Sequence, residues 1–181
     1  MPFTRDHQLI LGAAFIGCLG VFGMHVLLPA LPAIGARFAA GAAETQLLIS
    51  GSLLAIGFGN LAVAPLSDRF GRRPVLLASL ALYVLGSLAG LVAPTLEALI
   101  AARVVQAFGG GASQGVIRAS LTDRFGAGAA TAIAYTAMAI LVVPMFAPTL
   151  GGFAVEHYGW RAPFGLAALL GAAVVAFALL R

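Results

Sequence analysis

The sequence predicts an all-α membrane protein with six transmembrane helices, and three observations lead to that prediction. Of its 181 residues, 61% are hydrophobic and only 9% are charged, whereas a soluble domain is about 25% charged. There is too little polar surface to cover a globule in water, so the solvent is lipid, which admits only helices and closed barrels. The apolar runs are long and continuous rather than alternating, which is typical of membrane helices and not of barrel strands.

The expected spans follow one another through short links. Residues 1–181 are predicted to form one bundle, with spans over about 9–34, 45–66, 74–93, 96–121, 131–155 and 162–180. Proline removes a backbone donor from a helix. The first span carries Pro29 and Pro32 near its end, and the fifth carries Pro144 and Pro148. Each pair is predicted to allow bending, and a static kink is the alternative interpretation.

The ten basic residues are unevenly placed with respect to these spans. If the N-terminus is inside, seven lie in inner segments: Arg5, Arg69, Arg72, Arg73, Arg118, Arg124 and Arg181. The outer links hold only Arg37 and Arg161, and Arg103 lies within a span. Because inner loops of membrane proteins are rich in Lys and Arg, both termini are predicted to be cytoplasmic. A bacterial inner membrane is the expected location. This interpretation accounts for the net charge of +4 without a nucleic-acid partner.

The link between the second and third spans, Gly59–Pro74, concentrates charge. Its charged residues are Asp68, Arg69, Arg72 and Arg73. Gly71 permits a tight turn, and Pro74 suits the first turn of the next helix. We therefore predict a short basic hairpin here. The run Asp-Arg-Phe-Gly occurs at 68–71 and again at 123–126, both at the same membrane face, but four residues do not establish an internal repeat.

Arg103 is a charged residue inside the fourth span, where insertion scales assign a cost of about 2.5–3.5 kcal/mol. Four later residues follow Arg103 at steps of three or four, which places a polar stripe on one helix face. These residues are Gln106, Gly110, Gln114 and Arg118. A stripe over the full depth of the span predicts a hydrated cavity. The alternative is an arginine that extends to the outer head groups.

His25 is the second polar residue at membrane depth, in the outer half of the first span and at about the level of Arg103. A membrane histidine is either a packing residue or a proton carrier. The hypothesis is that His25 and Arg103 face one cavity. The sequence contains no phosphate-binding Gly-Lys-Ser loop, no His/Cys/Glu metal set and no nucleophile–base pair. We expect no enzyme activity, no metal and no cofactor.

Four ordered segments resemble signatures of the major facilitator superfamily. Gly59–Pro74 resembles its signature between helices two and three, and Arg103-Val-Val-Gln106 with Gly109-Gly-Gly resembles its helix-four proton-antiporter signature. Pro144–Gly152 resembles its helix-five antiporter signature. Pro29-Ala-Leu-Pro32 matches the helix-one pattern of the drug:proton antiporters. The chain is most similar to the Bcr/CflA subfamily.

The resemblance implies the N-terminal half of the major facilitator fold and efflux of small drug-like compounds, driven by a proton gradient. It assigns Arg103 to proton coupling, and places His25 where Bcr/CflA proteins often carry an acidic residue, so that His25 would take over that role. It implies an inner gate formed by Gly59, Asp68, Arg69, Gly71, Arg72 and Arg73. It implies a helix bend that limits leak, formed by Pro144, Pro148, Gly151 and Gly152. Helices one and four line the cavity in that fold, which assigns Gln106 and Gln114 to its lining.

The superfamily has twelve helices in two halves, and this chain matches the first half. A second six-helix half is therefore an expected partner, as a covalent C-terminal half or as a homodimer mate, beside the lipid bilayer and a small-molecule substrate. Without it, the cavity face with Arg103, Gln106 and Gln114 is expected to be exposed. The alternatives are a non-transporting fragment, a regulatory membrane subunit, or a metabolite carrier of the same superfamily.

Overall fold

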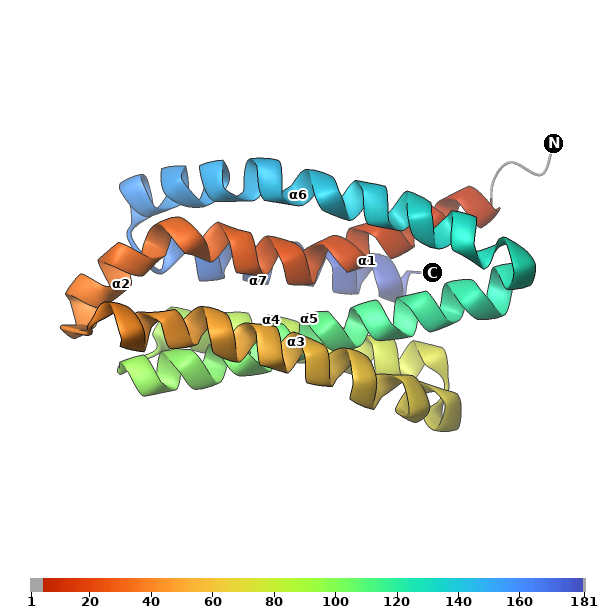
Figure 1. Ribbon diagram of the computed structural model, residues 1–181, viewed down its shortest axis with the longest axis horizontal. Helices are drawn as coiled ribbons and strands as arrows, with labels where there is room; N and C mark the ends of the chain where they lie inside the picture. The colour runs from red at the N-terminus through yellow and green to blue at the C-terminus, as the bar shows by residue number, and fades with distance from the viewer. Residues whose placement is uncertain (1–4, 181) are drawn as a thin grey trace.

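The computed structural model describes residues 5–180 as a bundle of helices with roughly parallel axes (Figure 1), and describes side chains from Leu9 onward. The elements are α1 (Arg5–Leu27), η1 (Leu28–Ala30), α2 (Leu31–Phe38), α3 (Ala42–Phe70), α4 (Arg72–Val92), α5 (Leu96–Phe125), η2 (Gly126–Gly128), α6 (Ala129–Tyr158) and α7 (Ala162–Leu179). The described part of the chain is entirely helical apart from its short links, so the all-α prediction is confirmed. The side chains of Arg5 and Arg181 lie outside the described residues.

The prolines of the first expected span change the type of helix. Pro29 lies in the first turn of η1 and Pro32 in the first turn of α2. Both lack the N–H that would continue the α1 ladder, so the chain passes through one 3-10 turn before α2. The second helix ends where Ala39 adopts a left-handed conformation, with φ 51°. The Gly41 amide then donates to Glu44 Oε2 at 2.8 Å, which caps the start of α3.

Five apolar stretches are long enough to cross a membrane: Leu9–Phe38, Ala42–Phe70, Arg72–Val92, Leu96–Tyr158 and Ala162–Leu179. Helix length and hydropathy therefore give five candidate spans among the described residues, and the expected count of six is not confirmed. The reason is that Leu96–Tyr158 is one stretch of 63 residues. As a single helix it would be about 95 Å long, about three times the thickness of the hydrocarbon core. The chain instead reverses at η2, so that α5 and α6 run back past each other (Figure 1).

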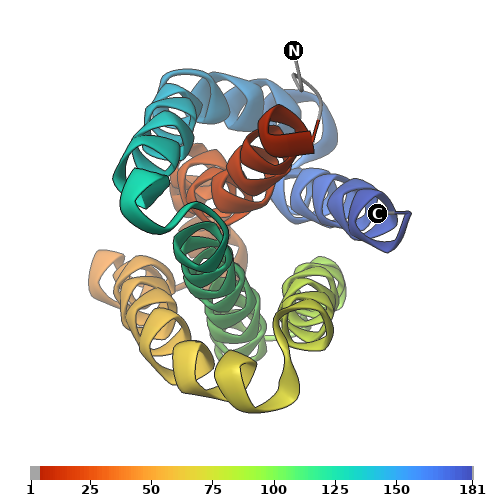
Figure 2. The same cartoon turned by 90° about the vertical axis from the view of Figure 1, so that its right-hand side faces the viewer.

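The helices pack around a central pair, α1 and α5 (Figure 2). Helix α5 packs against α3 and α4, whereas α1 packs against α6 and α7. On one side of the central pair, α4 and α7 pack closely against each other. On the other side, α3 and α6 are not among the closely packed pairs. The central helices are therefore covered on one side and less covered on the other.

Close packing around α5 depends on glycine. A Cβ at Gly59 of α3 would lie 2.5 Å from the Phe108 carbonyl oxygen and 2.9 Å from the Ala112 nitrogen. A Cβ at Gly109 of α5 would lie 2.5 Å from the Tyr83 nitrogen. Helix backbones come this close only where a side chain is absent, so these glycines determine how near α3 and α4 approach α5.

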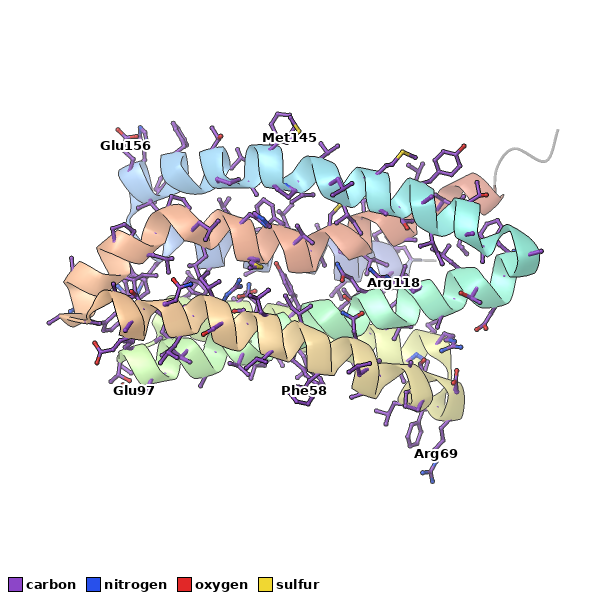
Figure 3. All side chains as sticks on the ribbon, viewed as in Figure 1. Phe58, Arg69, Glu97, Arg118, Met145 and Glu156 are labelled. Carbon is purple, nitrogen blue, oxygen red and sulfur yellow. The ribbon has the colours of Figure 1, made fainter. Side chains whose placement is uncertain are left out.

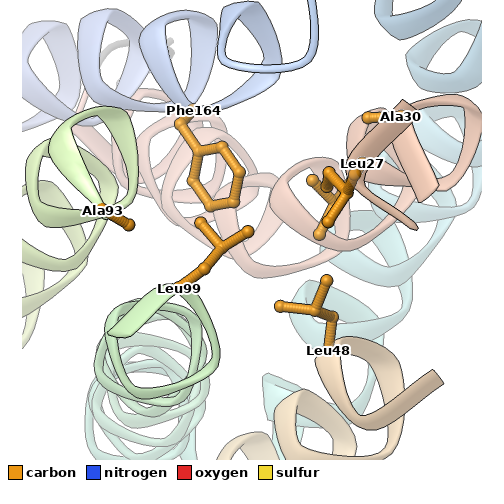
Figure 4. Close-up of a cluster of buried hydrophobic side chains, with 7 residues drawn as sticks. Leu27, Ala30, Leu48, Ala93, Leu99 and Phe164 are labelled. Atoms are coloured by element: carbon orange, nitrogen blue, oxygen red, sulfur yellow. The ribbon is translucent and has the colours of Figure 1, made fainter. Parts of the chain in front are cut away.

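The buried apolar residues form a core that joins most of the helices. Its largest cluster includes Leu27, Leu48, Leu99 and Phe164 from α1, α3, α5 and α7 (Figure 4). The outer surface is also apolar: Phe58 is 67% exposed and Met145 is 71% exposed. In Figure 3 these two side chains point away from the bundle on opposite sides. Such a surface is stable in lipid and not in water.

The charged residues lie at the two ends of the bundle. We call one of them the arginine-rich end; it holds Arg69, Arg72, Arg73, Arg118 and Arg124, with the start of α1 and the end of α7. Arg69 lies there in Figure 3, and Arg118 lies in the same half of the bundle, about two turns before the end of α5, whereas Glu97 and Glu156 lie at the opposite end. This separation leaves the middle of the bundle almost without charge, and Arg103 is the exception.

Candidate functional site

A chain of buried polar groups crosses the middle of the bundle. Arg103 is 3% exposed, and its Nη1 donates to Gln106 Oε1 at 2.6 Å. Gln106 Nε2 donates in turn to Ser87 Oγ of α4 at 2.8 Å. Ser87 Oγ donates to the Tyr83 carbonyl at 2.7 Å, and the Tyr83 hydroxyl donates to the Leu19 carbonyl of α1 at 3.0 Å. These bonds join α1, α4 and α5 around one guanidinium.

Arg103 has no carboxylate partner within the described part of the chain. Both ion pairs between described residues belong to Arg72, and Arg103 Nε is buried without a hydrogen bond. An uncompensated buried charge costs free energy, and buried charges in membrane helices are typical of functional sites. The arrangement can therefore attract an acceptor group or respond to a shift of the neighbouring helix.

Helix α1 carries a glycine at every third residue where it passes this polar chain: Gly17, which faces α6, and Gly20 and Gly23, which face α5 and α4. A Cβ at Gly23 would lie 2.9 Å from the Tyr83 hydroxyl and 3.4 Å from Arg103 Nη1. At Gly17, the carbonyl accepts a hydrogen bond from Gln114 Nε2 at 2.8 Å. We call these three residues the α1 glycine row. This row was not among the predicted site residues, although its Gly-x-x-Gly-x-x-Gly spacing was the signal for it.

The polar stripe of α5 does not form the exposed face that was expected. Arg103 and Gln106 are 3% and 1% exposed, and Gln114 is half-buried. The reason is that Gly23 of α1 leaves room for Arg103, the Gln114 amide donates to the Gly17 carbonyl of α1, and Gln106 turns toward α4. The stripe therefore lies between helices of this bundle, and its role in coupling stays a prediction.

His25 lies on a different face of α1 from the one that meets Arg103. Its Nδ1 donates to the Val21 carbonyl at 2.9 Å, one turn earlier in the same helix. Gly23 faces Arg103, and two further residues rotate a helix by about 200°. The structure thus does not bring His25 and Arg103 together, and the hypothesis that both face one cavity is not supported.

Arg72 is the centre of the predicted gate at the arginine-rich end. Its Nη2 lies 2.6 Å from Asp68 Oδ1 and 2.9 Å from Asp123 Oδ2, and its Nε donates to the same Asp123 oxygen at 2.9 Å. Arg72 Nη1 also donates to Ser67 Oγ. One guanidinium therefore joins the end of α3, the start of α4 and the end of α5.

Asp123 was not among the predicted gate residues. The signal for it was the second Asp-Arg-Phe-Gly run. Both runs end a helix, and the glycine of each has a positive φ, 92° at Gly71 and 48° at Gly126. Glycine is favoured in that conformation, so the two helices stop at corresponding residues. The aspartate of each run thereby comes within reach of the same arginine.

The other predicted gate residues have different surroundings. The Arg69 guanidinium lies over the Phe70 ring, 5.3 Å from its centroid. Arg73 Nη2 donates to the Leu179 carbonyl at the end of α7, at 3.1 Å. Gly59 lies in the packed middle of α3, as described above. Among the predicted set, the structure therefore places only Asp68 and Arg72 in one ion-pair network.

The predicted helix-bend residues lie where α6 meets the break between α1 and η1. Pro144 and Pro148 are inside α6, which is assigned as one helix. A Cβ at Gly151 would overlap the Val26 carbonyl oxygen and would lie 3.1 Å from Pro29 Cγ. Gly151 therefore allows the proline-bearing part of the first span to pack directly on α6.

Comparisons with known proteins decide the family. The family model described as Major Facilitator Superfamily matches residues 13–181. The chain belongs to the major facilitator superfamily. This result confirms the resemblance seen in the sequence, and it identifies a multi-pass membrane protein of a transporter family rather than an enzyme.

Individual relatives of the superfamily agree with this assignment. The chain is 33% identical over 160 residues to the chloramphenicol resistance protein of Pseudomonas aeruginosa, covering 87% of this chain and 38% of that one. It is 29% identical over 165 residues to multidrug resistance protein D of Escherichia coli strain K12, covering 90% and 41%. The chain spans less than half the length of the curated relatives it matches.

A solved structure of the superfamily shows the same fold. The proton:xylose symporter XylE aligns with a TM-score of 0.87 over 100% of this chain and 46% of its own chain. The identity is 13%, so this likeness shows the fold alone. Members of the superfamily are transporters of small molecules in a lipid bilayer. For metal ions, no group of three or more His, Cys, Asp or Glu side chains occurs among residues 9–180.

Proposed function

We propose that this chain forms the N-terminal half of a proton-coupled exporter of drug-like compounds that works by alternating access. The observation that carries the proposal is the buried guanidinium of Arg103, which has no carboxylate partner among the described residues and lies between α4 and Gly23 of α1. A membrane protein keeps such a charge at a cost. The names of two relatives, a chloramphenicol resistance protein and a multidrug resistance protein, support drugs as the substrate class.

In this proposal the stretch Leu96–Tyr158 crosses the membrane twice, as α5 and α6, which gives six spans. The arginine-rich end lies in the cytoplasm of a bacterial cell, with both termini, because inner segments carry most of the arginines. The arginines that gather toward one end of the bundle support this orientation: Arg69, Arg72, Arg73, Arg118 and Arg124.

A second six-helix half is part of the proposal, either in the same polypeptide or as a second copy. It would cover the side of the bundle where α3 and α6 are not packed together. Alternating access requires two halves that rock about a site between them. The proton gradient supplies the free energy, so no cofactor is required.

Proton coupling in this proposal operates through α1. His25 and Gly23 lie on different faces of that helix. A proton on His25 adds a positive charge to one face, while Arg103 presents its own charge to another. A small shift of α1 then changes the contacts between Gly23, Arg103 and the Tyr83 hydroxyl, which links protonation to helix packing.

The test is drug transport by the assembled protein in proteoliposomes under an imposed pH gradient, with ethidium as the probe. The proposal expects gradient-driven ethidium movement that His25→Ala and Arg103→Gln both reduce. Gly57→Ala is the control, because a Cβ at Gly57 meets nothing within 4 Å. Transport that persists without a pH gradient, or that neither variant affects, would contradict proton coupling through these residues.

A non-transporting fragment or regulatory subunit is the second candidate. A metabolite carrier of the same superfamily is the third. Purification distinguishes the first two: a chain that stays monomeric and moves no substrate supports the fragment. Competition by sugars but not by cationic drugs would support the metabolite carrier.

A further inference from the structure

Two neutral side chains from different helices hold the middle of α1 by its backbone. The Tyr83 hydroxyl of α4 donates to the Leu19 carbonyl at 3.0 Å, and Gln114 Nε2 of α5 donates to the Gly17 carbonyl at 2.8 Å. Leu19 and Gly17 are two residues apart, which is about 200° around the helix. The middle of α1 is therefore held from two sides, and we call Tyr83 and Gln114 the α1 clasp.

The backbones of α1 and α5, the central pair of the bundle (Figure 2), meet within one turn of the clasp. A Cβ at Gly110 of α5 would lie 2.9 Å from the Gly20 Cα, and a Cβ at Gly20 would lie 3.4 Å from the Gly110 carbonyl carbon. Backbones come this close only where side chains are absent. At this contact, therefore, no interlocked side chains resist a tilt of α1 on α5.

The Tyr83 side chain is itself enclosed by neighbouring helices. It is 1% exposed. A Cβ at Gly171 of α7 would lie 2.9 Å from its Cδ1, and a Cβ at Gly110 of α5 would lie 3.5 Å from its Cδ2. The ring therefore fills a narrow space between α5 and α7, and its hydroxyl reaches α1 one turn before Gly23.

The clasp fixes the next turn of α1 against Arg103. A Cβ at Gly23 would lie 2.9 Å from the Tyr83 hydroxyl and 3.4 Å from Arg103 Nη1, so both groups lie beside the same residue of α1. The α-helix ends at Leu27, so only a short segment, which includes His25, follows the clasp. A tilt of α1 at the clasp would therefore move this segment relative to Arg103.

We propose that Tyr83 is a positioning residue of the transport cycle: its hydroxyl holds α1 in the described arrangement, and α1 tilts at the clasp when this hydrogen bond opens. In an α-helix the Leu19 carbonyl also accepts from the amide four residues later, and a carbonyl has two lone pairs. When the clasp opens, α1 therefore keeps its own hydrogen bonds, and only the phenol loses its partner. The role in transport rests on the proposed function, whereas the hold on α1 does not.

The experiment combines amide hydrogen exchange of the purified protein with the ethidium transport assay. Tyr83→Phe keeps the ring and removes the hydroxyl, so we expect the amides of residues 20–27 to exchange about fivefold faster, the effect of one neutral hydrogen bond. The maximum transport rate should fall by about the same factor, while the half-saturating ethidium concentration stays unchanged, because the buried hydroxyl does not contact substrate. Ser79→Ala is the matched control, since it removes another buried hydroxyl of α4, which bonds to the Val75 carbonyl of the same helix.

A second variant tests the clasp from the other side. Gln114→Leu removes the donor to the Gly17 carbonyl; it should also speed exchange in α1, and it tests the clasp if Tyr83→Phe does not fold. Equal exchange in Tyr83→Phe and Ser79→Ala would overturn the hold on α1. Faster exchange with wild-type transport in Tyr83→Phe would overturn the role in transport. If the wild-type protein itself shows no gradient-driven transport, the proposed function is overturned, and with it the transport role of Tyr83.

Discussion

Arg72 and Arg103 are the same residue type in opposite surroundings. Arg72 lies at the arginine-rich end with 27% of its side chain exposed, and it contacts two carboxylates. Arg103 lies in the middle of the bundle with 3% exposed, and its hydrogen-bond partner is the neutral Gln106. The arginine that carboxylates neutralise is thus Arg72, which lies near water, where an unpaired charge costs least.

The difference indicates what each arginine contributes. Exposed ion pairs stabilise proteins by only about 0.2–1 kcal/mol, but Arg72 connects three helices that could otherwise separate. Arg103 is a net cost in the folded state, because its charge is desolvated and unpaired. We infer that Arg72 holds an arrangement of helices together, while Arg103 is retained for a function other than stability.

The largest expected effect separates function from stability at Arg103. Arg103→Met should reduce gradient-driven transport by about 10- to 100-fold, which corresponds to hydrogen bonds of a charged group of about 1.5–3 kcal/mol. Thermal stability should change little, because the variant removes a buried charge but also leaves the buried Gln106 oxygen without its donor. Transport assays and thermal unfolding in detergent measure the two effects. A parallel loss of stability would assign Arg103 a structural role and remove the contrast with Arg72.

The second prediction changes the space around Arg103 without changing its charge. Gly23→Ala places a Cβ 2.9 Å from the Tyr83 hydroxyl and 3.4 Å from Arg103 Nη1. Overpacking of this kind costs about 1–3 kcal/mol, and it should lower transport as well as the melting temperature. In Gly57→Ala the new methyl group meets open space, so stability should be unchanged or slightly higher. Full transport by Gly23→Ala would show that the α1 glycine row is not needed for coupling.

The third prediction addresses the other arginine. Asp68→Asn and Asp123→Asn each leave Arg72 one carboxylate, and each should lower stability by about 0.2–1 kcal/mol. The double variant should cost more than the sum of the two, because both carboxylates share one guanidinium. Added salt should reduce these differences, and it should not alter the effect of Arg103→Met.

In the Asp68→Asn and Asp123→Asn variants, conformational switching of the assembled transporter should slow while membrane insertion is retained. Wild-type switching in the double variant would contradict a gate at Arg72.

The sequence predicted the fold class and the local chemistry better than the contacts between helices. The helices could be predicted because lipid is the solvent. The break in the first span could be predicted because Pro29 and Pro32 lack the backbone N–H donor. The polar stripe of α5, which includes Arg103 and Gln106, was predicted from residue spacing, because residues on one helix face recur at steps of three or four. Which face meets which helix depends on the packing of all helices, and no local pattern encodes it. The sequence therefore misjudged the exposure of Gln106 and the position of His25 relative to Arg103.

The smallest expected effect concerns a third arginine, at the end opposite to Arg72. Among the described residues Arg161 has no carboxylate partner, and it is exposed: its guanidinium lies 4.4 Å from the Trp160 ring centroid, and its Nε donates to the Leu91 carbonyl at 2.8 Å. An exposed cation–π contact contributes about 0.5–1 kcal/mol, and the Trp160 ring also packs against the Phe38 ring, so Trp160→Leu should lower stability by at least that amount. Arg161→Lys should lower stability by less than Trp160→Leu, because an ammonium still binds the ring and the carbonyl. Salt should matter less here than at Arg72, because neither partner of Arg161 carries a full charge. Thermal unfolding of both variants at low and high salt measures this. A salt dependence equal to that of the Asp123→Asn variant would show that the two ends are held by the same kind of interaction.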